Sequence, residues 1–289
     1  MLKSIVIVTI SVLKLASVED AYREHLDYST VMQGQLSTDI AEVWNTPDMA
    51  GQNYLVMQPA SAEKVYLRFI ENPATESHVA MTTHGWNATE LLVKDPDTLA
   101  GQLANSPFTI IGPPKDLWAA PDAPRAMQVR GPSGEVLYLT RNLDFDINTF
   151  VDRVFIMVLA GPSMTGLSEF YANKMGLPVG DATPFKIGVI SRAQNQPADT
   201  TYPLAIATVA KKFLIELDEY PAAIEARPIE DGFLPAGTSM VSFEVADLDA
   251  FDIAWRATPK ILRERPYDGR RTAVTVGPAG EWIELIETD

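Results

Sequence analysis

A nine-residue stretch occurs twice in this chain and decides how the rest is interpreted. Gly131-Pro132-Ser133-Gly134-Glu135-Val136-Leu137-Tyr138-Leu139 returns as Gly277-Pro278-Ala279-Gly280-Glu281-Trp282-Ile283-Glu284-Leu285. The shift from Gly131 to Gly277, 146 positions, is close to half of the 289-residue chain, and it predicts a tandem duplication. Tyr138 in the first copy corresponds to Glu284 in the second. The two halves are therefore predicted to share a fold but not a chemistry.

The bulk composition is that of a globular protein and argues against a nucleic-acid partner. Apolar residues make up 46% and charged residues 21% of the chain, within the range of folded domains. The net charge is −15 and there is no long basic run, so the clustered Lys and Arg that bind phosphate backbones are missing. With no cysteine, disulfides, thiolate ligands and a thiol nucleophile are excluded.

The amino terminus superficially resembles a signal peptide, because an apolar run from Ile5 to Leu13 follows a lysine. The similar run Val151–Val158 plays the same part in the second half, so both are predicted to be buried strands. No apolar run approaches the ~20 residues of a membrane-spanning helix, and we expect no membrane partner. Together with the missing cysteines, this favours a cytoplasmic location.

The order of strand-like and helix-like segments indicates four βαβββ units. The first unit is predicted from a helix at Ser17–Leu26 and strands at Ile5–Val12, Ala41–Trp44, Asn53–Met57 and Val65–Ile70. The second has a helix at Asp97–Leu103 and strands at Trp86–Val93, Met127–Val129 and Val136–Thr140.

The second half repeats this order. The third unit has a strand at Val154–Leu159, a helix at Leu167–Met175 and a strand at Phe213–Leu217. The fourth has a helix at Leu248–Arg256 between strands at Met240–Val245, Ala273–Val276 and Trp282–Ile286. The predicted class is α+β, with two units in each of two domains, 1–145 and 146–289. A single unrelated α+β domain would leave the doubled stretch unexplained.

Several segments resemble the vicinal oxygen chelate superfamily, which includes glyoxalase I, bleomycin-resistance proteins and extradiol ring-cleaving dioxygenases. Ser168–Leu177 is similar to the family's Phe-Tyr…Leu-Gly helix, and Phe243–Asp249 and Gly280–Leu285 follow in the expected order. The resemblance covers essentially the whole chain. It implies that each pair of units curls its strands into a cup that holds a ligand, often with a divalent metal.

In metal-binding members, the resemblance implies His or Gln from first strands and Glu from last strands as ligands. The second half keeps the acids Glu216 and Glu284, but its first strands present Arg153 and Met240. Arginine donates only and cannot ligate a cation. In the first half the corresponding residues are Ser4, Arg68, Trp86 and Tyr138, which do not form a plausible set of metal ligands.

The three histidines are expected to be structural or loop residues, with a displaced ligand role for His84 left open. No metal site and no cofactor are predicted, while Fe, Mn or Zn stays open.

The leading hypothesis places the site in the second domain, with Arg153 between Glu216 and Glu284. Two carboxylates in one pocket repel unless a cation intervenes, and arginine supplies one. Arg153 would then hold a substrate oxygen while one acid moves a proton. The alternative is a structural ion pair without chemistry. Residues expected to contact the substrate are Met240, Ser242, Trp282 and Tyr138.

The function expected from these features is metal-independent isomerase or lyase chemistry on a small apolar or aromatic carbonyl compound. One alternative is a drug-resistance type of binding protein without turnover. Another is a metal-dependent extradiol-type dioxygenase with displaced ligands. The family resemblance makes a homodimer the expected assembly.

Overall fold

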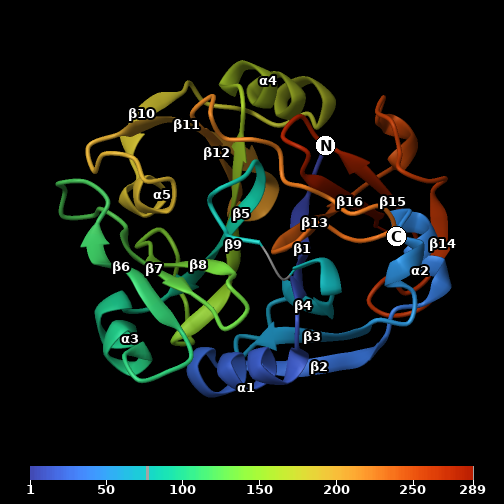
Figure 1. The fold of residues 1–289 in the computed structure, drawn as a ribbon, viewed down its shortest axis with the longest axis horizontal. Helices are drawn as coiled ribbons and strands as arrows, with labels where there is room; N and C mark the ends of the chain where they lie inside the picture. Colours follow the sequence, from blue (N-terminus) through green and yellow to red (C-terminus); the bar gives the residue numbers. More distant parts are fainter. Residues whose placement is uncertain (76–77, 289) are drawn as a thin grey trace.

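Two curled β-sheets of eight strands each form the molecule (Figure 1). The computed structural model describes residues 1–75 and 78–288, with Lys211 described only in its backbone. The chain runs through four successive βαβββ units, so the predicted α+β class and the fourfold repeat are confirmed. Among the described helices the longest is α1 with 12 residues, and none has the length and apolar character of a membrane span.

The first two units have the following elements. Unit 1 comprises β1 (Ser4–Val12), α1 (Leu15–Leu26), β2 (Tyr28–Gln35), α2 (Thr38–Trp44), β3 (Asn53–Pro59) and β4 (Tyr66–Glu71). Unit 2 comprises β5 (Gly85–Val93), α3 (Pro96–Leu103), β6 (Thr109–Asp116), β7 (Arg125–Arg130) and β8 (Val136–Arg141).

The last two units repeat the pattern. Unit 3 comprises β9 (Val151–Gly161), α4 (Met164–Glu169, continued by a π-helical turn at Phe170–Lys174), β10 (Thr183–Lys186), α5 (Gly188–Ala193), β11 (Thr201–Val209) and β12 (Phe213–Glu219). Unit 4 comprises β13 (Thr238–Val245), a 3-10 turn at Leu248–Ala250, β14 (Lys260–Leu262), β15 (Arg270–Val276) and β16 (Trp282–Glu287).

The first unit shares a sheet with the fourth, and the second with the third. Units 1 and 4 form one sheet, in the order β14-β15-β16-β13-β1-β4-β3-β2, and its hollow is called here the terminal cup. Units 2 and 3 form the other, in the order β10-β11-β12-β9-β5-β8-β7-β6, around the central cup. The connection at residues 142–150 brings β9 back antiparallel to β5, so unit 3 joins the sheet of unit 2. The predicted pairing of units within 1–145 and within 146–289 is therefore wrong.

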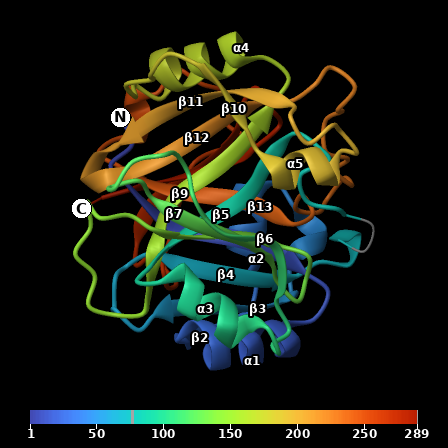
Figure 2. The same cartoon turned by 90° about the vertical axis from the view of Figure 1, so that its left-hand side faces the viewer.

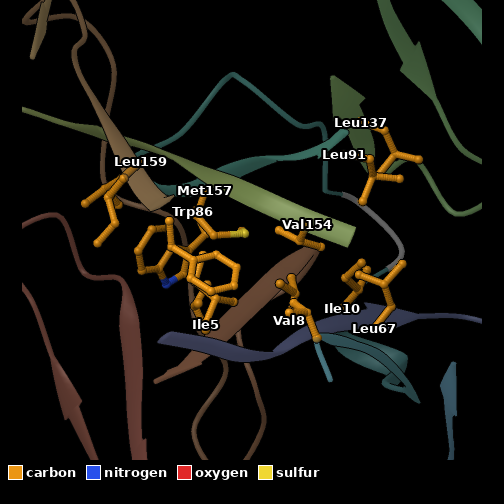
Figure 3. Close-up of a cluster of buried hydrophobic side chains, with 14 of the residues drawn as sticks. Ile5, Val8, Ile10, Leu67, Trp86, Leu91, Leu137, Val154, Met157 and Leu159 are labelled. Carbon is orange, nitrogen blue, oxygen red and sulfur yellow. The ribbon is translucent and has the colours of Figure 1, made fainter. Parts of the chain in front are cut away.

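The main apolar core lies between the two sheets. Figure 3 shows Ile5 and Val8 of β1 facing Trp86 of β5 and Met157 of β9, and all four side chains are buried. Strands β1 and β5 are buried along their whole length, because one face meets this core and the other a cup. This explains why both are nearly unbroken apolar runs in the sequence.

The doubled Gly-Pro-Ser/Ala-Gly-Glu turn ties the two sheets together. In unit 2, Glu135 accepts hydrogen bonds from the Ser133 amide at 2.9 Å and from the hydroxyl of Tyr22, on α1 of unit 1, at 3.0 Å. Because units 1 and 2 belong to different sheets, this bond crosses between sheets. The carboxylate lies over Gly131, where any Cβ atom would collide with it.

The second copy of the turn makes the same contacts. Glu281 accepts from the Ala279 amide at 2.8 Å and from the hydroxyl of Tyr171, in unit 3, at 3.0 Å. The repeated stretch thus forms two equivalent turns, each of which is hydrogen-bonded to the other sheet.

Two predicted elements differ from the structure. Ala41–Trp44, predicted as a strand, is the end of α2, which begins where the Ser37 hydroxyl caps the Ile40 amide. Leu248–Arg256, predicted as a helix, forms only the 3-10 turn, and Phe251 is already extended. The Arg256 amide bonds to Val274 of β15 instead, so the segment follows the sheet.

Candidate functional site

The strand register defines four matched positions in each cup, one on each of its four central strands. In the terminal cup, Thr9 of β1 pairs with Arg68 of β4, and Ser242 of β13 pairs with Glu284 of β16. In the central cup the same register places Val158 beside Glu216 and Glu90 beside Tyr138. These positions lie on the first and last strands of the units, where the family resemblance implies metal ligands.

A buried hydrogen-bond network fills these positions in the terminal cup. Arg68 donates to the Thr9 hydroxyl from Nε at 3.0 Å and from Nη2 at 2.8 Å, and Nη2 lies 3.5 Å from Glu284 Oε2. Glu284 also accepts from Trp44 Nε1 at 2.7 Å, from the Tyr267 hydroxyl at 2.9 Å and from Ser242 Oγ.

The terminal cup is closed by these side chains. Trp44, at the end of α2, lies with its ring 4.5 Å from the Arg68 guanidinium, and Tyr267 comes from the connection between β14 and β15. Arg68, Glu284, Trp44 and Tyr267 are all buried. Because the charges are paired and hydrogen-bonded, the arrangement is that of a structural ion pair in a filled interior.

The central cup contains a cavity of about 440 Å³. Such a volume is within the usual range for small-molecule sites. Glu90, Tyr138 and Glu216 lie on its lining, so three of the four matched positions face open space. Much of the wall is apolar, including Phe155, Ile156, Ile187, Val189, Leu204 and Ile206. The cavity therefore combines apolar walls with a polar floor.

The floor holds two carboxyl groups without a cationic partner among the described residues. Burial raises the pKa of Glu90 to about 7, against the opposing effect of the Thr140 hydroxyl. Burial, with the nearby charges of Asp218 and Glu90, raises the pKa of Glu216 well above its ordinary value. Glu216 keeps some accessible surface because it borders the cavity. At neutral pH the pair therefore holds at least one proton.

Further polar groups surround this pair. Asp218 is two residues beyond Glu216 on the same face of β12, is fully buried, and burial raises its pKa to about 8. The Tyr138 and Tyr220 hydroxyls and both Asp218 carboxyl oxygens have no hydrogen-bond partner in the described part of the chain. Unpartnered buried polar groups are rare in native proteins and indicate a role that involves a ligand, a water or a proton.

The residues at the matched positions do not fit the His-and-Glu metal set that the family resemblance implies. The central cup offers Val158, Glu216, Glu90 and a phenol, Tyr138, and no imidazole. Within the described residues, no three His, Asp or Glu side chains converge in a way that could hold a metal ion. The donor chemistry favours proton transfer over metal binding at this floor.

The structure does not bring the predicted catalytic group together. Arg153 lies at the start of β9, five residues before Val158, which offsets it by roughly 16 Å from the level of Glu216. Its guanidinium contacts Asp152 at 3.5 Å and Glu63 at 3.8 Å instead. Glu216 faces the central cup and Glu284 is enclosed in the terminal cup. The predicted grouping of these three residues is therefore wrong.

The residues predicted to contact the substrate are likewise divided between the two cups. Met240, Ser242 and Trp282 are buried in the terminal sheet, where the Arg256 guanidinium lies 3.5 Å from the Trp282 ring. Tyr138 lines the cavity. Glu90 is not among the predicted site residues, and its place in an apolar strand resembles that of Glu244. The register matches it with Ser242 instead, and this residue is the missed member of the floor.

Solved structures with the same fold exist, although sequence similarity is weak. No protein-family model and no curated protein sequence matches the chain. Glyoxalase I from Zea mays superposes with a TM-score of 0.66 at 13% identity, covering 98% of this chain and 92% of the other. A putative dioxygenase from Bacillus subtilis superposes with a TM-score of 0.64 at 14% identity, covering 99% and 85%. The chain therefore shares the fold of these two proteins over nearly its full length.

Proposed function

We propose that the central cup is the active site of an enzyme that moves a proton on a small carbonyl compound with an apolar or aromatic body. The observation that carries this proposal is the pair Glu90 and Glu216 on the floor of an apolar cavity, where neither acid forms an ion pair with a described residue. Carboxyl groups whose pKa values are raised toward neutrality are suited to general acid and base catalysis.

The roles follow from the environment of each acid. Glu90, with a pKa near 7, is partly ionised at neutral pH and removes a proton from the carbon next to the carbonyl. Glu216 keeps its proton beside Asp218 and donates it toward the carbonyl oxygen. The C–H bond breaks as Glu216 protonates the oxygen, and an enol forms. In a substrate with a β,γ double bond, Glu90 then delivers its proton to the far carbon while the O–H proton returns to Glu216, which completes an isomerisation. The free hydroxyl of Tyr138, next to Glu90 in register, is a second donor to that oxygen.

The test uses hydrogen–deuterium exchange at the methyl group of aryl methyl ketones in D2O, followed by proton NMR. We expect the protein to accelerate exchange, the rate to rise with pH through about 7 as Glu90 ionises, and Glu90→Gln or Glu216→Gln to lower the rate at least 100-fold. Glu230→Gln, which alters an exposed acid, is the matched control and should keep the rate. Equal rates in all three variants would contradict the proposal.

A binding protein without turnover is the second candidate, and the mostly apolar walls favour it. In that case the ketone binds, returns unchanged, and Glu216→Gln alters only affinity. The dioxygenase alternative requires a metal set that the matched positions do not supply.

A further inference from the structure

The mouth of the central cavity carries a cluster of cations. Lys115 on β6, Lys186 on β10 and Arg192 on α5 all lie on the cavity lining, and all three are exposed. They come from three elements because β6 and β10 are the two edge strands of a curled sheet, which brings both edges to the opening. Figures 1 and 2 show β6, β10 and α5 on the same side of the molecule.

No described carboxylate neutralises these cations. None of the three forms an ion pair with a carboxylate in the part of the chain that the structure describes. Arg192 donates from Nη2 to the carbonyl of Ile111, which fixes its guanidinium against β6 and leaves its charge uncompensated. In a chain of net charge −15, three unpaired cations around one cavity form a local field of the opposite sign.

The floor does not repel an anion as two ionised carboxylates would, because burial keeps at least one proton on the Glu90–Glu216 pair. The cavity is thus polarised along its length, with cations at the mouth, apolar walls, and hydrogen-bond donors at the floor. Trp118, 52% exposed, lines the cavity and adds an aromatic surface for a ring.

We propose that the ligand of this cavity is an aromatic carboxylate, bound with its carboxylate at Lys115, Lys186 and Arg192 and its uncharged, oxygen-bearing end at Glu90 and Glu216. This inference rests on the proposed function only for the chemistry at the floor. It names the class of substrate and the direction in which it binds.

The test compares three probes that share an acetylphenyl group and differ in charge: 4-acetylbenzoate, the neutral 4-acetylbenzamide and the cationic 4-acetylbenzylamine. A matching naphthyl series is measured in the same way. Dissociation constants are measured by isothermal titration calorimetry. We expect each carboxylate to bind at least 10-fold more tightly than its amide, with the amine weakest, and the preference to shrink in 0.5 M salt. The triple variant Lys115→Gln/Lys186→Gln/Arg192→Gln should remove most of the preference.

The matched control is Lys14→Gln/Lys64→Gln/Lys94→Gln, which removes the same charge from exposed lysines elsewhere and should keep the preference. The inference is overturned if no carboxylate binds more tightly than its amide, or if the control triple loses the preference equally. A carboxylate preference without methyl exchange supports this inference while the proposed enzyme activity fails. Exchange on neutral ketones without a carboxylate preference gives the opposite result.

Discussion

The Glu284 carboxylate accepts hydrogen bonds from Trp44, Tyr267 and Ser242 and pairs with Arg68, all in an interior without exposed surface. Its counterpart in the central cup is Tyr138, whose hydroxyl has no partner in the described residues. All four matched positions differ in residue type between the two cups, and these differences separate a satisfied interior from an unsatisfied floor. The difference between Tyr138 and Glu284, visible in the doubled stretch, marks which cup is filled.

Removing one member of the terminal ion pair should be strongly destabilising. Arg68→Met leaves Glu284 buried without its cation, and we expect the free energy of unfolding to fall by about 3–5 kcal/mol. Adding Glu284→Gln should recover part of this loss, because the double variant buries no unpaired charge. Urea denaturation measures both. Arg23→Met, at an exposed pair with Asp20, is the control and should change little. A loss below 1 kcal/mol for Arg68→Met would show that the pair is not structural.

The sequence identified Glu216 but not Glu90, the second acid on the floor of the central cup. Glu90 and Glu244 occur at similar places in apolar strands, which suggested a shared architectural role. The pairing of β5 with β9 contains register shifts, one of them next to Glu90. Such bulges move every later side chain by one position, and nothing in the local sequence marks them. The register aligns Glu90 with Ser242, two residues before Glu244, and this displacement was enough to hide the floor of the site.

At the scale of elements, the doubled turn behaves alike in both copies, whereas the helices α2 and α5 differ between the two cups. The turn is repeated with its contacts intact, so it predicted the repeat correctly. The helices α2 and α5 occupy equivalent places in units 1 and 3, yet only α2 ends in a tryptophan that fills its cup. The segment Ala41–Trp44, predicted as a strand, is helical because the Ser37 cap begins a helix that runs through it.

The doubled turn gives a sharp test of the close approach between Glu135 and Gly131. Gly131→Ala places a methyl group against the Glu135 carboxylate and should lower the free energy of unfolding by about 1–3 kcal/mol. Gly101→Ala, inside α3 with open space around it, should instead stabilise the protein by up to ~1 kcal/mol. Thermal unfolding of both variants decides the matter. Equal shifts in the two melting temperatures would show that the carboxylate does not constrain the turn.

At the scale of the whole molecule, the pairing of units 1 with 4 and 2 with 3 interlocks the two halves. The repeat predicted the units but not their partners, because either pairing would build each sheet from two units with the same number of strands. The connections between units determine which units share a sheet. The connection at residues 142–150 places β9 beside β5. The consequence is one cup built from the middle of the chain, which is open, and one built from its ends, which is closed.

The buried acids predict how the stability of the whole molecule depends on pH. Burial raises the pKa of Glu90, Glu135 and Glu281 from 4.5 to about 7 and that of Asp218 from 3.8 to about 8. The folded state therefore binds more protons than the unfolded state between pH 4.5 and pH 7, so the free energy of unfolding falls as pH rises through this window. Two histidines act in the opposite direction: burial and Arg227 lower the pKa of His78 to about 3, and burial lowers the pKa of His84. They are outnumbered by the buried acids, to which Glu216, with its raised pKa, also belongs.

We expect the free energy of unfolding, measured by urea denaturation, to fall by several kcal/mol from pH 5 to pH 8, since a single shift from 4.5 to about 7 corresponds to about 3 kcal/mol. Repulsion within a chain of net charge −15 has the same sign but is screened by salt, so the fall should persist in 0.5 M NaCl. Glu135→Gln/Glu281→Gln should make it shallower, because these amides do not titrate. Constant or rising stability over this range in salt would mean that the acids of the doubled turn and of the central cup reach water, and the assignment of a protonated floor would fail with it.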